Sequence, residues 1–290
     1  MGAIVKDQEY SIVIASIGRS CLNETLHDIL ISSRLPSEII IVLPEGSDFT
    51  LDTKYKEYDL DIFIFHAPKG QVKQRQAGLL KCNYDIVVQL DDDVRFNKNV
   101  LNSLVHEVSE NANIIISPLV YSHSLECQTG TELGQNRFLR FLLGADQAKE
   151  FLGIGYISKI GLAIRPSHLE NKDLIRSDWL PGGCMAYHKK FSIVGSEITS
   201  PKGKFYGEDL INTHIMKEKG AVLFFATNLI VITPFEYTPD IRNVVSHFKS
   251  LIFIQKIKRG QILYLRTILF CLIRYLHSLF PKQKLDQSDN

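Results

Sequence analysis

Short apolar runs alternate with segments of helical periodicity through the first half of the chain. The runs are rich in Ile and Val, and they are apolar at consecutive positions rather than at every second one. A strand that is apolar on both faces belongs to a sheet that is covered by helices. We therefore expect strands at Ser11–Ala15, Glu38–Leu43, Asp61–Phe65, Asp85–Leu90 and Asn113–Ser117.

The segments between these runs carry apolar residues at helical spacing, and they predict helices at Asn23–Ile31, Gln71–Cys82 and Asn97–Glu110. Strands and helices in this alternation favour an α/β fold with an open, mostly parallel sheet flanked by helices. Ligands bind beyond the carboxyl ends of such strands, because loops converge there and helix N-termini direct their amides at anions. A functional site is therefore expected in the loops that follow the strands.

The alternation becomes weaker after Tyr121, and Glu132–Gly161 fits no element clearly. Further along, Arg176–Phe191 is typical of a loop that leads into a short strand. The segment Phe205–Gly220 is typical of a loop that opens a helix ending at its glycine. The globular pattern ends near residue 240.

The C-terminal segment differs from the rest in charge. From Lys249 onward the chain has eight Lys or Arg and two Asp, a net charge of +6, which leaves −5 for the residues before it. Ser250–Phe280 is apolar at most positions, and its polar residues recur at helical spacing. They are Arg266, Thr267, Cys271, Arg274, His277 and Ser278.

This narrow polar stripe favours a helix that lies in a membrane interface with its basic residues on anionic headgroups. A membrane-spanning helix would not carry such charges near its centre. A helix packed on the protein, or in a homo-oligomer interface, is the alternative interpretation.

The overall composition is that of a soluble globular protein, with 45% hydrophobic and 22% charged residues. A net charge of +1 does not suit a general nucleic-acid binder. The five cysteines are scattered and have no metal-ligand spacing, which indicates free thiols in a reducing compartment. The N-terminus lacks the pattern of a secretory signal. We expect a cytoplasmic protein with no nucleic-acid partner.

Three consecutive aspartates, Asp91, Asp92 and Asp93, follow the fourth predicted strand. Because their charges repel, the cluster is either a well-solvated turn or a place where a cation binds. Two carboxylates spaced one residue apart at a strand end can offer hard oxygen ligands to Mn²⁺ or Mg²⁺ beside a substrate's phosphates. Asp91 and Asp93 have this spacing, whereas Asp92 would point elsewhere.

Two arginines are expected near the same edge of the sheet. The helix after the third strand would present Arg75 there, and guanidinium groups suit diphosphates because their planar donors stay charged. The loop after the first strand contains Arg19 and Gly18, and the glycine allows the backbone to approach a ligand. A solvated arginine and a plain turn are the ordinary alternatives.

Five segments, in order, resemble motifs of the family 2 glycosyltransferases of the GT-A fold. These enzymes transfer a sugar from a nucleotide diphosphate donor with inversion at the anomeric carbon. The segments resemble, in turn, the nucleotide-binding strand, the Gly-x-x-x-x-Arg-Asn-x-Gly helix, the Asp-x-Asp element, the donor and acceptor segment, and the Glu-Asp motif. They are SIVIASIGRS, GQVKQRQAG, QLDDDV, DWLPGGCMAYHKK and YGEDLIN.

The resemblance covers residues 10–235 and implies a GT-A catalytic domain at 1–240, followed by a basic amphipathic tail at 241–290. The chain departs from the family at Gln76, where Asn is usual. It also has LPEGSD where the family commonly has Asp-Asp-Gly-Ser, so Glu45 is the nearest equivalent of the acidic residue that meets the nucleoside. The loop ASIGR replaces the commoner Pro-Thr-Tyr-Asn-Arg type. The nucleobase is therefore not identified.

The resemblance implies a role for each matched residue. Asp93, assisted by Asp91, would hold Mn²⁺ or Mg²⁺, and Asp209 would be the catalytic base beside Glu208. The donor-binding residues would be Ala15, Ser16, Gly18, Arg19, Glu45, Arg75, Asp91 and Asp92. The wall beside sugar and acceptor would contain Trp179, Gly182 and Gly183.

Each role has an ordinary alternative. Acidic residues such as Glu208 and Asp209 also complement a helix dipole. Trp179 could be a buried core residue instead. His247 could reach the metal or the diphosphate from the C-terminal side, although a lone histidine is more often structural.

The leading hypothesis is a metal-dependent inverting glycosyltransferase that acts on a glycan or lipid-linked acceptor in cell-surface polysaccharide biosynthesis. It would be peripheral on the inner face of the cell membrane, bound to the anionic surface through its tail. One alternative is a sugar-1-phosphate nucleotidyltransferase, which would favour a glycine-rich, basic signature near the N-terminus. The other is a non-catalytic, membrane-recruited protein that binds nucleotide sugars.

Overall fold

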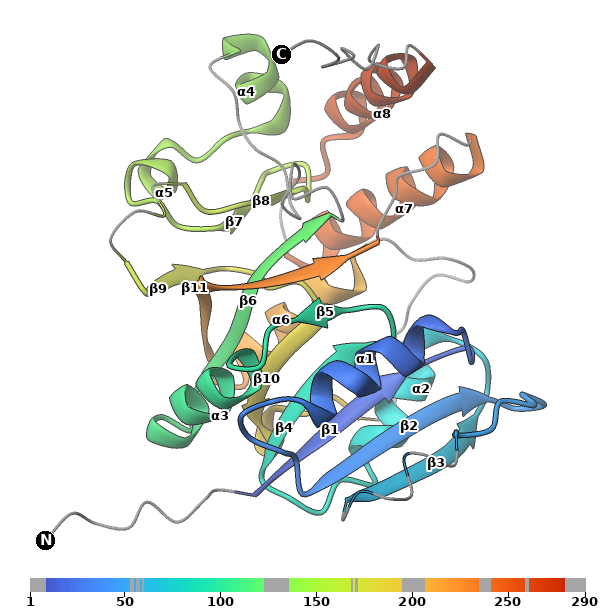
Figure 1. Ribbon diagram of the computed structural model, residues 1–290. Coiled ribbons are helices and arrows are strands. Elements are labelled where there is room, and N and C mark those ends of the chain that lie inside the picture. Colours follow the sequence, from blue (N-terminus) through green and yellow to red (C-terminus); the bar gives the residue numbers. More distant parts are fainter. Residues whose placement is uncertain are drawn as a thin grey trace, which may run out of the picture.

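The computed structural model describes most of the chain, namely residues 9–52, 55, 58, 60–122, 136–167, 169, 172–194, 207–234, 241–258 and 261–279. One large sheet carries helices on both faces, and a smaller layer of helices covers one end (Figure 1). The strands of the large sheet are β1 Tyr10–Ala15, β2 Glu38–Pro44, β3 Asp61–Ala67, β4 Ile86–Asp91, β5 Arg95–Phe96, β6 Ile114–Ser122, β9 Leu174–Ser177, β10 Cys184–His188 and β11 Val222–Thr233. Most of the helices are α1 Cys21–Leu30, α2 Gln71–Leu79, α3 Val100–Glu110, α6 Glu208–Glu218, α7 Ile241–Ile257 and α8 Tyr264–Leu279.

The strand order is β3-β2-β1-β4-β10-β6-β11-β5, with β9 also paired to β11. The first four strands of this order run parallel. β10 lies antiparallel between β4 and β6, and β11 runs parallel to β6. The predicted α/β fold with a mostly parallel sheet is confirmed, and β10 is its antiparallel insertion.

The consecutive apolar residues in the strands are explained by two cores, one on each face of the sheet. Ile12 and Ile14 of β1 pack with α1 and α3 on one face. Val13, between them, packs on the other face with residues of α2, α6 and α7. Because successive side chains of a strand point to opposite faces, both parities must be apolar.

Helix α2 lies unusually close to the sheet at Gly78. A Cβ atom on Gly78 would lie 2.6 Å from Cγ1 of Val13 and 3.0 Å from Cγ2 of Val42. Only glycine allows this approach without a shift of the helix. The close packing fixes the position of Arg75, which lies one turn earlier on α2.

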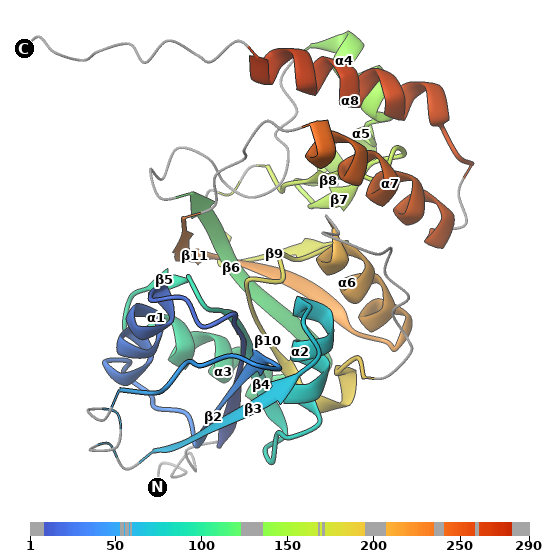
Figure 2. The same ribbon diagram turned by 90° about the vertical axis from the view of Figure 1, so that its right-hand side faces the viewer.

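The expected single helix over Ser250–Phe280 is wrong. The C-terminal segment forms two helices, α7 and α8, which lie above the sheet in the second view (Figure 2). The side chain of Gln255 holds the turn between them, because its Oε1 accepts from Leu263 N at 2.7 Å and its Nε2 donates to Thr267 Oγ1 at 3.0 Å. Ile254 of α7 belongs to the core of the sheet, so α7 packs on the large domain; the division at residue 240 stays a prediction.

The segment Glu132–Gly161 fitted no predicted element. Its described part, with the residues directly after it, forms two short helices and a small hairpin. These elements are α4 Arg137–Leu143, α5 Gln147–Phe151, β7 Tyr156–Ile157 and β8 Ala163–Ile164. Apolar residues of α4, β7 and β8 form a third core with α7 and α8, whereas α5 has no buried residue. Within the described part of the chain, no helix combines the length and apolarity needed to cross a membrane.

Candidate active site

A cavity of about 370 Å³ lies at the carboxyl end of β4. Its walls come from the end of β4, the loop before β10, the start of α6 and the inner side of α7. Its polar side chains are Gln71, Arg75, Asp91, Glu208, Asp209, Thr233 and His247. Strand ends and a helix N-terminus therefore converge on one cavity, as expected for an open α/β sheet.

Arg75 connects the two acidic motifs at this cavity. Its guanidinium is buried, with the residue 4% exposed, and it donates through Nη2 to Asp91 and through Nη1 to Glu208. Burial acts to lower the pKa of Arg75, but the charges of Asp91 and Glu208 outweigh it and raise the pKa above the ordinary value. Arg75 is therefore a permanently charged bridge between β4 and α6.

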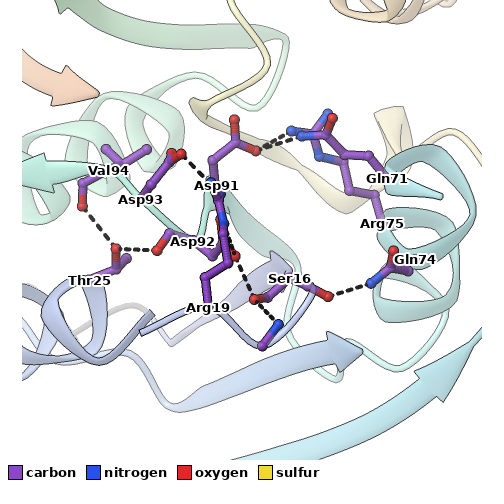
Figure 3. Close-up of polar contacts among 11 residues, drawn as sticks. Ser16, Arg19, Thr25, Gln71, Gln74, Arg75, Asp91, Asp92, Asp93 and Val94 are labelled. Atoms are coloured by element: carbon purple, nitrogen blue, oxygen red, sulfur yellow. Dashed lines mark hydrogen bonds and ion pairs between the residues drawn. The ribbon is translucent and has the colours of Figure 1, made fainter. Parts of the chain in front are cut away.

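Asp92 points away from the cavity and holds the loop after β1 (Figure 3). Its buried carboxylate accepts from Ser16 Oγ at 2.5 Å and also from Arg19. Ser16 Oγ in turn accepts from Gly18 N at 2.9 Å. The expectation that Asp92 points elsewhere than its neighbours fits this geometry, and Asp92 can affect a donor only through the loop it supports.

Asp91 and Asp93 lie beside each other, with different partners (Figure 3). Asp91 Oδ1 accepts from Arg75 and from Gln71 Nε2 at 3.0 Å, while its other oxygen points away from them. Asp93 Oδ2 accepts from Arg19 Nη2 at 3.0 Å. Burial, and then repulsion from the negative charge of Asp91, raises the pKa of Asp93.

This pair fits the chemistry of a divalent cation. Asp91 and Asp93 offer hard oxygen atoms, and a cation would relieve their repulsion. The described residues contain no group of three or more His, Cys, Asp and Glu arranged to hold a metal. The protein would therefore supply two carboxylates, and phosphate oxygens or water would complete the coordination, as is common for Mg²⁺.

His247 lines the opposite side of the cavity on α7. Its Nδ1 lies 3.5 Å from Arg274 Nη1, and its ring packs edge-on against Phe270 at 6.2 Å between centroids. Burial, together with the charge of Arg274, lowers the pKa of His247 to about 4. The imidazole is neutral at pH 7, the form that can bind a metal, but a role at the metal stays a prediction.

Glu208 and Asp209 begin α6 and have different surroundings. Gly207 before them has a φ of +95°, which glycine adopts without strain. Glu208 pairs with Arg75, whereas Asp209 Oδ1 accepts from its neighbour Leu210 N at 3.0 Å. Burial raises the pKa of both carboxyl groups. Asp209 is the stronger candidate for a base, because a raised pKa favours proton uptake and Arg75 already engages Glu208.

Gly182 and Gly183 allow charged side chains to approach the backbone at the cavity wall. A Cβ on Gly182 would lie 3.3 Å from both Arg75 Nη1 and Asp209 Cβ, and one on Gly183 would lie 3.2 Å from Asp91 Oδ2. The loop is held in place because Gln89 Nε2 donates to Gly182 O at 2.8 Å. These glycines therefore bring the three charged groups together.

Trp179 packs in the core, which was the alternative to its expected place in the sugar and acceptor wall. It is 2% exposed, its Nε1 donates to Ile164 O at 2.9 Å, and its ring meets Phe225 edge-on at 5.6 Å. It lines the cavity from behind. A face that is so little exposed has little surface to offer a sugar, and the stacking role gains no support.

The remaining predicted donor residues lie at the ends of β1 and β2. Ala15 pairs with Asp91 across the sheet, which places the β1 loop beside the aspartates. Glu45 is exposed in the turn after β2 and does not line the cavity. Of the predicted residues, the cavity brings together Arg75, Asp91, Trp179, Gly182, Gly183, Glu208, Asp209 and His247.

Sequence reasoning missed two glutamines of α2. Gln71 contacts Asp91, and buried Gln74 donates through Nε2 to Ser16 O at 2.7 Å and Val42 O at 2.8 Å. Gln74 therefore ties α2 to the loops after β1 and β2. A signal was present, because Gln71, Gln74 and Arg75 are spaced to share one helix face.

Three solved structures illustrate which proteins share this architecture. GalNAc-T7, solved with UDP, GalNAc and Mn²⁺, superposes with a TM-score of 0.59 at 17% identity, over 87% of this chain and 48% of its own. The mannosyltransferase PcManGT from Pyrobaculum calidifontis, with GDP-Man and Mn²⁺, gives 0.53 at 12% identity, over 95% and 73%. S. aureus TarS 1-349, with UDP-GlcNAc, gives 0.52 at 13%, over 94% and 73%. The chain thus spans about half the length of GalNAc-T7, and the likeness establishes the GT-A fold.

A comparison with protein families gives the class of protein to which the chain belongs. Residues 11–170 match the family model described as Glycosyl transferase family 2. This match covers more than half of the chain, so the chain belongs to glycosyl transferase family 2. No curated protein sequence matches it.

Proposed function

We propose that this protein is a metal-dependent inverting glycosyltransferase that moves a sugar from a nucleotide diphosphate donor to a hydroxyl group. The observation that carries the proposal is one cavity in which Arg75 joins Asp91 to Glu208, with Asp209 beside them. The solved relatives with UDP, GDP-Man and UDP-GlcNAc support a nucleotide-sugar donor. The two that contain Mn²⁺ support a divalent cation.

Donor binding is assigned to the edge formed by the β1 loop and the end of β4. Asp91 and Asp93 would hold Mn²⁺ or Mg²⁺, which when bound supplies a Lewis acid that offsets the negative charge of a leaving diphosphate. Arg19 pairs with Asp93 at 3.0 Å and is half exposed, so its guanidinium lies beside the expected position of the phosphates. Arg75 adds a fixed positive charge at the cavity wall.

Asp209 is assigned as the base. An acceptor hydroxyl attacks the anomeric carbon and gives its proton to Asp209, while the bond from that carbon to the diphosphate oxygen breaks and its electron pair leaves with the diphosphate. Attack on the side opposite the leaving group inverts the anomeric centre. Glu208 positions Arg75 through their ion pair.

The acceptor is proposed to be a glycan or a lipid-linked saccharide, and the setting cell-surface polysaccharide biosynthesis. The support is the basic, apolar C-terminal segment, which suits a reaction near a membrane.

Donor binding should depend on a cation and on Asp93. The melting temperature of the wild-type protein is measured with a panel of nucleotide sugars that includes UDP-GlcNAc and GDP-Man. The protein's own donor should raise the melting temperature in Mn²⁺ but not in the presence of a chelator. The gain corresponds to about 2.7 kcal/mol at a hundredfold excess over Kd. Asp93→Asn should lose this gain, because it removes a cation ligand.

Asp173→Asn is the matched control, because it makes the same chemical change at an exposed aspartate outside the cavity. It should retain the full gain. An equal gain in chelator, or in Asp93→Asn, would contradict the assignment of Asp93 as a metal ligand.

A further inference from the structure

Helix α8 packs on the protein through a side that is partly polar, and it presents an apolar side to solvent. Its buried residues are Thr267, Phe270 and Cys271, and Arg274 is half-buried. Thr267 Oγ1 accepts a hydrogen bond from Gln255 Nε2 of α7 at 3.0 Å, and Arg274 Nη1 lies 3.5 Å from His247 Nδ1. The polar stripe expected to meet headgroups therefore faces α7 at these positions; the structure does not describe the side chains of His277 and Ser278.

The outer side of α8 is a continuous apolar surface. Leu265 is 84% exposed, and the other exposed apolar residues of the helix are Tyr264, Ile268, Leu269, Leu272, Ile273 and Leu276. We name this set the outer face of α8. Scattered exposed leucines are ordinary on soluble proteins, but a contiguous face of this kind marks a surface that binds something.

Helix α4 extends the outer face. It packs against α8, and the two helices lie at the same end of the molecule (Figure 2). Phe138 and Phe141 of α4 are both more than half exposed. The guanidinium of Arg266 lies 4.1 Å from the centroid of the Phe141 ring, so a positive charge sits at the border of the apolar surface.

A basic cavity opens beside this border. It has a volume of about 470 Å³ and lies between the turn after β7, the end of α7 and the start of α8. Its charged side chains are Lys159, Lys258 and Arg266, and none of its described lining residues is acidic. Such a cavity attracts an anion.

We propose that the outer face of α8 and the phenylalanines of α4 enter a bilayer of anionic phospholipids, and that the basic cavity receives a headgroup phosphate. The apolar side chains lie at the depth of the acyl chains, and Arg266 lies at the headgroup level. This arrangement is that of an interfacial helix, not of a spanning one.

Charge favours a bilayer over a second copy of the chain as the occupant. The segment from Lys249 onward carries a net charge of +6, and two copies joined through it would bring these charges together. An anionic surface attracts the same charges.

Gly161 lines both the basic cavity and the active-site cavity, so a bound bilayer lies next to the active site. Delivery of a lipid-linked acceptor there rests on the proposed function, whereas bilayer binding does not.

Co-sedimentation of the full chain with vesicles tests the proposal. Wild type should sediment with vesicles of phosphatidylcholine and phosphatidylglycerol. The double variant Leu272→Glu with Leu276→Glu should bind at least about tenfold more weakly, because charges would have to enter the apolar layer. Leu80→Glu, at an exposed leucine directly after the distant helix α2, should bind like wild type.

The basic cavity is tested on the same vesicles. Lys159→Gln with Arg266→Gln should weaken binding by about fivefold for each charge removed. Lys69→Gln with Lys98→Gln removes two exposed charges elsewhere and should change binding much less. An equal loss in both pairs would overturn the cavity as a headgroup site.

A second measurement does not depend on sedimentation. The Leu272→Trp variant should show a blue shift of its fluorescence on addition of vesicles, above the constant signal of buried Trp179. The proposal is overturned if no shift occurs or if the Leu272→Glu, Leu276→Glu variant sediments like wild type. It is also overturned if wild type is a dimer without lipid and this variant is a monomer, because a second copy then covers the face.

Discussion

Replacement of Asp209 by Asn is expected to lower kcat for sugar transfer by about 10²–10⁴-fold, the usual contribution of a general base. The amide keeps the oxygen that accepts from Leu210 N at 3.0 Å but cannot take up a proton. The melting temperature should not fall, because burial already disfavours the ionised carboxylate. Initial rates at saturating donor and acceptor measure the effect, and Asp173→Asn should keep the wild-type kcat.

The same assignment fixes the sign of the pH dependence. A base must be deprotonated, so kcat should fall as pH falls through the pKa of Asp209, and burial places that pKa above the ordinary 3.8. The residual activity of Asp209→Asn should lack this acid limb. An Asp209→Asn enzyme with the wild-type rate and the same acid limb would show that the base is another group.

Replacement of Arg75 by Met is expected to lower the free energy of unfolding by about 3–5 kcal/mol, the usual cost of removing one partner from a buried ion pair. The variant leaves the partly buried carboxylates of Asp91 and Glu208 without their shared cation. Denaturant unfolding at pH 7 measures the loss. It should become smaller as pH falls, because protonation neutralises Glu208, whose pKa burial raises above its ordinary value.

The electrostatic cause can be separated from the loss of packing. In a background of Asp91→Asn and Glu208→Gln, the Arg75→Met change should cost much less, because neutral amides need no opposite charge. An equal cost in both backgrounds would assign the role of Arg75 to packing alone.

The sheet could be predicted because its physical cause is local. Consecutive apolar residues such as Ile12 and Val13 pack on opposite faces, and a sheet covered on both sides requires that pattern. The 12-residue strand β11 was not predicted. Its register shifts between Ala226 and Ile230, and long-range pairing with β6, rather than local periodicity, defines it.

The motifs identified the candidate site residues, but they did not predict the ion pairs that join these residues. Asp91, Glu208 and Asp209 were identified by their motifs, and they line one cavity where a strand end and a helix start meet. Their roles stay predictions. The Arg75 bridge to Glu208 joins residues 133 positions apart, and no periodicity carries that information. Trp179 shows the same limit, because an aromatic residue in a loop segment can face a ligand or the core.

The C-terminal segment shows which features of an amphipathic helix can be predicted from the sequence. The spacing of Thr267, Cys271 and Arg274 identified a helix with a polar side. It could not say which side faces the protein, because that depends on the polar partners Gln255 and His247 on another helix. Here the polar stripe lies on the side that packs on the protein, together with Phe270, and the other apolar residues of the helix are exposed.

The identity of the reaction is tested most directly by its products. Wild-type protein, Mn²⁺ and a panel of nucleotide sugars with saccharide acceptors should release a nucleoside diphosphate, and NMR of the product should show the anomeric configuration opposite to that of the donor. Chelation of the cation should abolish the release, and Asp209→Asn should slow it by about 10²–10⁴-fold. Release of pyrophosphate from a nucleoside triphosphate and a sugar 1-phosphate, or a product with retained configuration, would contradict the assignment.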